Sequence, residues 1–275
     1  MQRVRKQVDP TGGEDSYSAL LRQLMSIFDR GEPAGSSCTW RRRLTALLTT
    51  SRTVDIPKDA WPLLHELWRR ESEAKPFQCA DELPPLTRNG LWTDTLSIWR
   101  GDIVRLRTGA IVNAANSGLT GCYQPFHACV DNAIHTAAGP WLRDACEQIM
   151  RSRGRPEPTG TVTVTPGFYL PASHVFHTVG PVVHPGPATP RDEAALCQCY
   201  RRCLEAAREL GLSSIAFCAI STGIFAYPKR DAASVSLRVI RQFQMTCEGS
   251  LHVILVAFTS QDELIYREAV EEILE

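Results

Sequence analysis

The sequence predicts a three-layer α/β/α domain preceded by a small helical N-terminal extension. Two observations lead to this fold class: short apolar runs alternate with helical periodicity after about residue 90, and the earlier residues show helical periodicity alone. The 275 residues, 43% of them apolar, suffice for one large domain with an appendage. We therefore expect the extension over residues 1–90 and the α/β domain over residues 91–275.

The extension is predicted from leucines and tryptophans that recur every three or four residues between about residues 18 and 68. Leu20, Leu24 and Leu44 belong to this pattern, and Leu64 continues it. The proline-rich residues 75–89 then interrupt helical periodicity, which indicates a boundary.

The sheet of the main domain is predicted from six short apolar runs, at residues 96–99, 110–112, 161–165, 175–179, 215–220 and 251–258. Residues 161–165 alternate strictly, which is typical of an edge or half-exposed strand. Residues 215–220 are continuously apolar, which is typical of a central strand buried on both faces. Helical patterns lie between and after these runs, near residues 128–138, 141–153, 193–210, 229–243 and 261–274. Ligands of such sheets usually bind beyond the carboxyl ends of the strands.

Composition argues against several functional classes. Lys plus Arg equals Asp plus Glu at 30 each, so no net field attracts nucleic acid or a membrane surface. No secretory signal pattern is visible, and no run of about 18 apolar residues occurs. The ten cysteines are spread irregularly through a chain large enough to fold without disulfides. We expect a cytoplasmic protein with reduced thiols and no membrane or nucleic-acid partner.

Two loops carry polar residues directly after apolar strands. Asn113 and Asn116 follow one strand, where side-chain amides could bind a hydroxyl-rich ligand or merely satisfy turn geometry. Residues 221–228 (STGIFAYP) follow the central strand and open a helix, so their backbone N–H groups could hold phosphate oxygens. Gly223 would let this backbone turn closely. A plain strand-to-helix connection is the alternative, since no Walker lysine is present.

Cys122, His127 and Cys129 lie within eight residues and suit a zinc ion. Three protein ligands would leave the open position of a catalytic site, whereas a structural zinc would need a fourth ligand such as His135. Unrelated loop residues are the alternative. Asp131 follows at once, and its carboxylate could orient a water against a glycosidic carbon or simply interact with the helix dipole.

In this order, residues 101–103 (GDI), 111–117 (IVNAANS), 131–139 (DNAIHTAAG) and 221–228 closely resemble a macrodomain of the MacroD type. The resemblance covers roughly residues 96–275 and implies a mixed central sheet. Where the usual chain has a run of glycines, this one has residues 121–129 (GCYQPFHAC). That replacement and the helical extension resemble the zinc-dependent branch of the family, which implies Zn²⁺ as the cofactor.

The resemblance also implies roles for individual residues around ADP-ribose. Asp102 would bind the adenine amino group and the backbone of Ile103 would support the ring, with Phe258 a weak candidate beside adenine. Asn113 and Asn116 would hold the distal ribose next to Asp131. The loop that would cradle the diphosphate comprises Ser221, Thr222, Gly223, Ile224 and Phe225, the last of these lying against the distal ribose.

The resemblance and these residues together predict a zinc-dependent hydrolase that removes mono-ADP-ribose from protein side chains, with an expected ester linkage through Asp or Glu, and releases ADP-ribose. Asp131 and Asn116 would be catalytic, with Cys122, His127 and Cys129 holding the metal beside them. Its partners would be ADP-ribose and the mono-ADP-ribosylated protein. The alternatives are a non-catalytic ADP-ribose reader, an O-acetyl-ADP-ribose deacetylase or an enzyme acting on ADP-ribose phosphates, and a scaffold with structural zinc.

Overall fold

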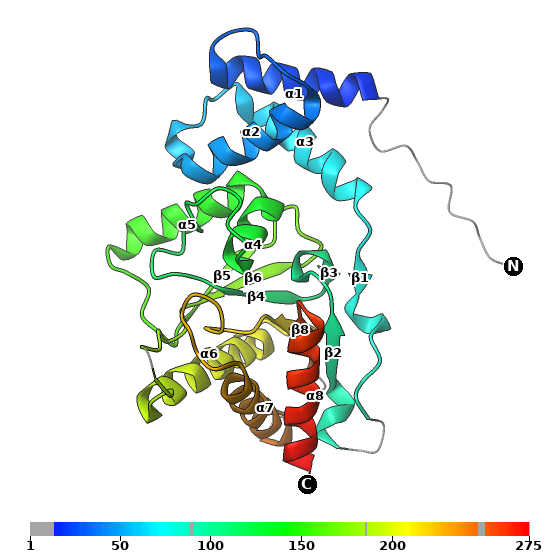
Figure 1. The fold of residues 1–275 in the computed structure, drawn as a ribbon, viewed down its shortest axis with the longest axis vertical. Helices are drawn as coiled ribbons and strands as arrows, with labels where there is room; N and C mark the ends of the chain where they lie inside the picture. The colour runs from blue at the N-terminus through cyan, green and yellow to red at the C-terminus, as the bar shows by residue number, and fades with distance from the viewer. Residues whose placement is uncertain (1–13, 88–90, 185, 247–250, 275) are drawn as a thin grey trace, which may run out of the picture. The chain divides into compact units, whose positions relative to one another are not determined.

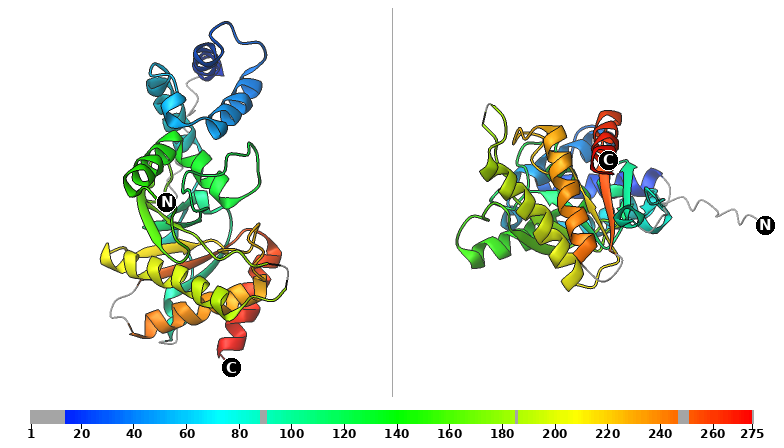
Figure 2. Two further views of the ribbon diagram at one scale, coloured as in Figure 1. Left: turned by 90° about the vertical axis from the view of Figure 1, so that its left-hand side faces the viewer. Right: turned by 90° about the horizontal axis from the view of Figure 1, so that it is seen from below.

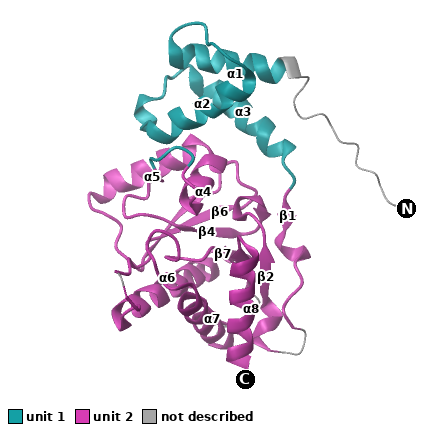
Figure 3. Ribbon diagram, viewed as in Figure 1, with its two compact units in different colours: residues 1–76, 123–126 teal, residues 77–122, 127–275 magenta. Residues whose placement is uncertain are grey.

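The computed structural model describes residues 14–87, 91–184, 186–246 and 251–274. The chain forms two compact units, Met1–Pro76 with Tyr123–Phe126, and Phe77–Cys122 with His127–Glu275 (Figure 3). Residues 77–87 therefore lie in the second unit, although the sequence analysis assigned them to the extension. Residues 1–13 and 88–90 of the expected extension lie outside the described residues.

In its described residues the first unit has three α-helices, α1 (Glu14–Asp29), α2 (Ser37–Thr50) and α3 (Ala60–Ala74), with the short η1 (Thr53–Asp55) before α3. The expectation of a helical extension is confirmed. Its leucine periodicity arises because each helix buries one face against the others. The fully buried side chains of this unit include Leu21, Leu24, Leu44, Leu64 and Leu67.

A mostly buried ion pair joins the helices of the first unit. Arg41 of α2 donates from Nε and Nη2 to the carboxylate of Glu71 on α3, over 2.6 and 2.8 Å. The hydroxyl of Tyr17 on α1 donates to the same carboxylate over 2.7 Å. Burial acts to raise the pKa of Glu71, but the hydrogen bonds from Arg41 and Tyr17 and the charges of Arg41 and Lys75 together outweigh it, and the net pKa is lowered.

The second unit is organised around a six-stranded sheet of order β2-β8-β7-β4-β6-β5 (Figure 1). Strand β5 pairs antiparallel with β6 at one edge, and the other pairings of this sheet are parallel, so the sheet is mixed. The edge position expected for residues 161–165 is confirmed. The strands are β2 (Leu96–Arg100), β4 (Ala110–Ala114), β5 (Val162–Pro166), β6 (His174–Thr178), β7 (Ser214–Phe217) and β8 (His252–Ala257).

Helices cover both faces of this sheet, which confirms the three-layer arrangement (Figures 1 and 2). One face carries α4 (Val130–Ala138) and α5 (Pro140–Arg153). The opposite face carries α6 (Pro190–Glu209), α7 (Lys229–Thr246) and α8 (Ser260–Leu274). Within the described ranges, none of the helices combines the length and apolar character that crossing a bilayer requires.

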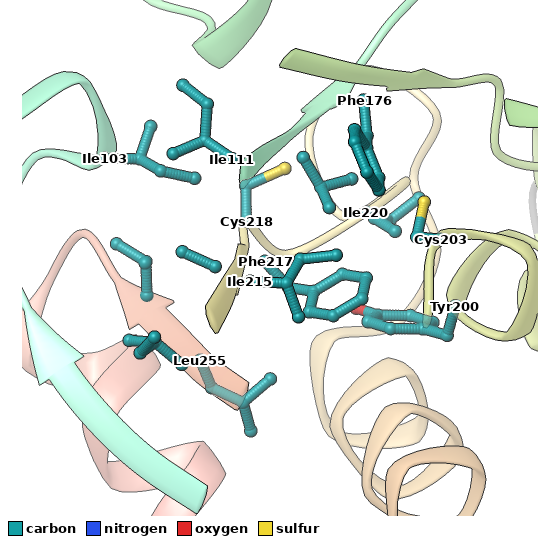
Figure 4. Packing of buried hydrophobic residues seen from close by; sticks show 14 of the residues in the cluster. Ile103, Ile111, Phe176, Tyr200, Cys203, Ile215, Phe217, Cys218, Ile220 and Leu255 are labelled. Carbon is teal, nitrogen blue, oxygen red and sulfur yellow. The ribbon is translucent and has the colours of Figure 1, made fainter. Parts of the chain in front are cut away.

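The core lies on both sides of β7, which is why its sequence is continuously apolar. Every residue of β7 is buried, and the ring of Phe217 packs on that of Tyr200 from α6, with centroids 4.9 Å apart (Figure 4). The strand ends at Phe217, three residues earlier than expected. Cys218 and Ile220 still contribute buried side chains, because the chain continues through the core beyond the strand.

Several short elements have no sequence signal that predicts them. A second, two-stranded parallel sheet pairs β1 (Gln78–Cys79) with β3 (Leu106–Arg107), and two residues are too few to show a period. Short 3₁₀ helices also occur in this unit, at η2 (Ala80–Glu82), η3 (Trp92–Thr95) and η4 (Ile103–Arg105).

Candidate active site at the carboxyl edge of the sheet

The parallel strands bring three predicted segments to one edge of the sheet. Asp102 follows β2, Asn116 follows β4, and Ser221 comes four residues after the end of β7. Because β2, β8, β7, β4 and β6 run parallel, their carboxyl ends meet at the same edge. Residues distant in the sequence therefore share one site.

Asp131 is the centre of a hydrogen-bonded group at this edge. Its side chain is buried near the start of α4, where Oδ1 accepts from Nδ2 of Asn113 over 2.8 Å. Nδ2 of Asn116 lies 3.5 Å from Oδ2. Burial raises the pKa of Asp131 to about 6, against the opposing effects of the Asn113 hydrogen bond and the Arg143 charge. The site thus holds a carboxylate between two amides.

The two asparagines use their amides differently. Oδ1 of Asn116 accepts from the N–H of Gly118 over 2.9 Å and its Nδ2 donates to the carbonyl of Gly121, so this residue does shape the turn. Asn113 lies within β4 and is fully buried. Its Oδ1 has no hydrogen-bond partner among the described residues, which leaves a buried acceptor beside Asp131.

Behind Asn113 lies His177, a residue that the sequence analysis did not single out. Nδ1 of His177 is 3.2 Å from Nδ2 of Asn113, and its Nε2 is 2.9 Å from Oγ1 of Thr165. Burial lowers the pKa of His177 to about 3, so the ring is neutral. The sequence signal that could have found this residue is a histidine in the middle of the predicted strand at residues 175–179.

Cys122, His127 and Cys129 converge as the sequence analysis expected. Their ligand atoms lie within 4.8 Å of one another, and Cys122 Sγ is 3.4 Å from His127 Nδ1. Two thiols and an imidazole at this spacing fit a zinc ion. No fourth His, Cys, Asp or Glu of the described ranges joins them within that distance. His135, considered as a fourth ligand, instead clusters with Cys146 and His177.

His127 and Cys129 are fixed to the start of the helix that carries Asp131. Cys129 is the N-cap of α4, and its Sγ accepts from the N–H of Asn132 over 3.4 Å. Nδ2 of Asn132 donates to the carbonyl of His127 over 3.0 Å. Gly121, at φ 85°, is required there because a Cβ would lie 2.9 Å from the ring of His135. Two of the three predicted zinc ligands, His127 and Cys129, are therefore tied to the helix that carries the carboxylate.

The loop after β7 exposes backbone donors, but it does not begin a helix directly. Among the described residues no acceptor meets the N–H groups of Gly223, Ile224 and Phe225. The loop leads into α7 at Lys229, where a helix was expected, but these three N–H groups lie at least four residues before the helix and are not its N-terminal donors. The turn also does not depend on Gly223, because the positive φ values fall at Ser221 (65°) and Ala226 (56°).

Gly180, which the sequence analysis missed, lets this loop approach the end of β6. A Cβ on Gly180 would lie 1.9 Å from Oγ of Ser221. The N–H of Val183 donates to the carbonyl of Phe225 over 2.8 Å and holds the other end of the loop. The donors of the loop are therefore positioned by the segment after β6.

The candidate adenine residues follow two neighbouring strands. Oδ1 of Asp102 accepts from the N–H of Val104 over 3.2 Å and so caps η4. The side chain of Ile103 is in the core (Figure 4), so its backbone is the part available to a ligand. Phe258 follows β8 with 75% of its surface exposed, and the N–H of Gly101 donates to the carbonyl of Ala257, which joins the two strand ends.

Comparison with known proteins agrees with this geometry. Residues 112–236 match the family model described as Macro domain. A protein of Treponema medium named "Protein-ADP-ribose hydrolase" is 46% identical over 187 residues, which are 67% of this chain and 70% of that protein. A protein of the same name from Staphylococcus aureus is 42% identical over 176 residues, 64% of this chain and 66% of that protein.

Solved structures show the same similarity. An Oceanobacillus iheyensis macrodomain mutant with ADPR is 41% identical, with a TM-score of 0.60, and the match covers 65% of this chain and 93% of that one. A Trypanosoma brucei macrodomain in complex with ADP-ribose is 26% identical, with a TM-score of 0.62, over 94% and 97% of the two chains. The chain therefore belongs to the macrodomain family.

Proposed function

We propose that this protein is a hydrolase that removes mono-ADP-ribose from modified protein side chains. The observation that carries the proposal is the buried carboxylate of Asp131, held by Asn113 and Asn116 at the carboxyl edge of the sheet. The names of the Treponema and Staphylococcus relatives, and the ADP-ribose bound to the Trypanosoma macrodomain, support the reaction and the ligand.

The diphosphate is assigned to the loop after β7. The N–H groups of Gly223, Ile224 and Phe225 supply donors to phosphate oxygens without a basic side chain, which suits a chain of zero net charge. Ser221 and Thr222 begin this loop, and Phe225 would lie against the distal ribose. Asp102 and the backbone of Ile103 would hold adenine beyond β2.

The distal ribose is assigned to Asn113 and Asn116, which places its modified carbon beside Asp131. Hydrolysis breaks the bond between that carbon and the side-chain oxygen of the target. Asp131 orients the attacking water and takes its proton, the water oxygen joins the ribose, and the target leaves as a carboxylate. The products are ADP-ribose and the unmodified Asp or Glu.

Zinc is proposed as the cofactor, with Cys122, His127 and Cys129 as the residues that would hold it. When bound, the ion would supply a Lewis acid that polarises an oxygen of the substrate. The protein's own contribution is to hold His127 and Cys129 at the helix start that carries Asp131. The backbone N–H of Asn132 donates to Sγ of Cys129, and its side-chain amide donates to the carbonyl of His127.

Metal-quantified protein should be incubated with a Glu-linked mono-ADP-ribosylated protein, with a Ser-linked one and with O-acetyl-ADP-ribose, and free ADP-ribose should be followed. We expect release from the Glu-linked substrate, and loss of release after chelation. Tight ADP-ribose binding with no release from any of the three would identify a reader instead. Release from O-acetyl-ADP-ribose alone would identify a deacetylase.

A further inference from the structure

Four buried residues from three adjacent strands and one helix form a single chain of hydrogen bonds behind the proposed ribose site. It runs from Asp131 to Asn113, from Asn113 to His177, and from His177 to Thr165, over 2.8, 3.2 and 2.9 Å. Asn113 and His177 are register partners in β4 and β6, so they lie side by side on the same face. Each of the four is less than a tenth exposed.

The chemistry of the first link fixes the orientation of the Asn113 amide. A carboxylate accepts hydrogen bonds and cannot donate them, so the atom of Asn113 that lies 2.8 Å from Asp131 must be the nitrogen. Both hydrogens of that nitrogen are then directed at Asp131 and at Nδ1 of His177. The carbonyl oxygen of Asn113 then bonds to neither of them, and among the described residues this buried acceptor has no hydrogen-bond partner.

The second link then fixes the tautomer of His177. Because Nδ1 must accept from Asn113, the proton of the neutral ring belongs on Nε2, where Oγ1 of Thr165 can accept it. Cys146 Sγ lies further away, 3.8 Å from Nε2. Both nitrogens of His177 are thus occupied by hydrogen bonds, so we assign His177 to positioning and not to a metal site with His135 and Cys146.

We propose that His177, held in its Nε2–H tautomer by Thr165, is a positioning residue that makes Asn113 present an acceptor to the ligand. An acceptor at this point selects a hydroxyl donor of the distal ribose. With the opposite tautomer, an N–H would face the N–H of Asn113 and disfavour this amide orientation. The inference rests on the proposed function for the identity of the ligand, but the tautomer itself does not depend on it.

The first test reads the tautomer in the unaltered protein. Ring ¹H–¹⁵N correlation spectra of histidine-labelled protein distinguish a protonated nitrogen from an unprotonated one. We expect His177 to show an unprotonated Nδ1 and a protonated Nε2, and Thr165→Val to weaken that preference. A protonated Nδ1 in the unaltered protein would overturn the proposal, whatever the protein binds.

The second test compares affinities for ADP-ribose and for ADP, which lacks the distal ribose. His177→Phe should lose about tenfold in affinity for ADP-ribose and less than about twofold for ADP, the effect of one misplaced hydrogen bond. His177→Asn, which keeps an acceptor near the position of Nδ1, should recover most of the loss. Equal weakening toward both ligands would overturn the proposal.

Thr163→Val is the matched control for Thr165→Val. Thr163 lies on the same strand and is the register partner of His177, but its hydroxyl donates to Glu157. The control should leave the ratio of the affinity for ADP-ribose to the affinity for ADP unchanged, whereas Thr165→Val should lower this ratio. If the unaltered protein binds neither ligand, the proposed function has failed, and the ring spectrum still decides the tautomer.

Discussion

Nδ2 of Asn113 donates a hydrogen bond to Oδ1 of Asp131 over 2.8 Å, and this bond joins β4 to the start of α4. It places the carboxylate at the carboxyl edge of the parallel strands, the same edge at which the loop after β7 begins. The same helix start carries Cys129, so this proposed zinc ligand is fixed next to Asp131.

Gly223→Ala should weaken binding of both ADP and ADP-ribose by about tenfold or more without lowering the melting temperature. Apart from its chain neighbours, no described residue has an atom within 4 Å of a Cβ at this position, so the fold tolerates the methyl group, which would stand beside the N–H groups assigned to the diphosphate. Titration calorimetry and thermal unfolding measure the two effects. Gly31→Ala, which also meets nothing within 4 Å, is the control and should change neither. Unchanged binding by Gly223→Ala would remove the diphosphate from this loop.

Cys122→Ala should lose bound zinc and lower the rate of ADP-ribose release by about a hundredfold or more, because the ion can no longer be held beside the substrate. Metal content and rate are measured on the same preparation. Cys38→Ala, which changes an exposed thiol of the first unit, should retain both. A Cys122→Ala protein without zinc that keeps the full rate would show that the metal has no part in the reaction.

Glu71→Gln should destabilise the helices of the first unit by about 2–3 kcal/mol near neutral pH, since Arg41 would lose its charged partner. The folded-state pKa of Glu71 is lowered, so its contribution is fully present above about 4.5, the ordinary value. As pH falls through the lowered pKa, the difference between the two proteins should disappear. Hydrogen exchange of the α2 and α3 amides at several pH values measures it.

The control for this prediction is Glu73→Gln. Glu73 is on the same helix, but its side chain is 60% exposed where it pairs with Arg69. Exposed ion pairs contribute little to stability, so the opening free energy measured by hydrogen exchange should change by less than about 1 kcal/mol. Equal effects of the two substitutions would contradict the role given to the Arg41 and Glu71 pair.

The order of the longer strands and helices in the second unit was predictable because these elements carry buried apolar residues at the period of a strand or a helix. The alternation of residues 161–165 indicated the edge strand β5, and the apolar run at residues 215–220 indicated the central β7. The pair β1 and β3 was not predictable, since two-residue strands carry no period.

The residues of the candidate site also divide into those that the sequence predicted and those that only the fold brings together. Cys122, His127 and Cys129 are close in sequence, so their spacing alone indicated a common ion. His177 was missed because its contact with Asn113 depends on the register between two strands that are 64 residues apart. Gly180 was missed for the same reason, since only the fold brings Ser221 against it.

The most direct test is the rate at which Asp131→Asn releases ADP-ribose from a Glu-linked mono-ADP-ribosylated protein. Asparagine keeps the shape of the side chain but cannot accept a proton from water, so the rate should fall by about a hundredfold or more. Affinity for ADP-ribose should stay within about threefold, and Asp144→Asn, which changes a carboxylate on α5, should leave both unchanged. Full activity in Asp131→Asn would contradict the assignment of the chemistry to this carboxylate.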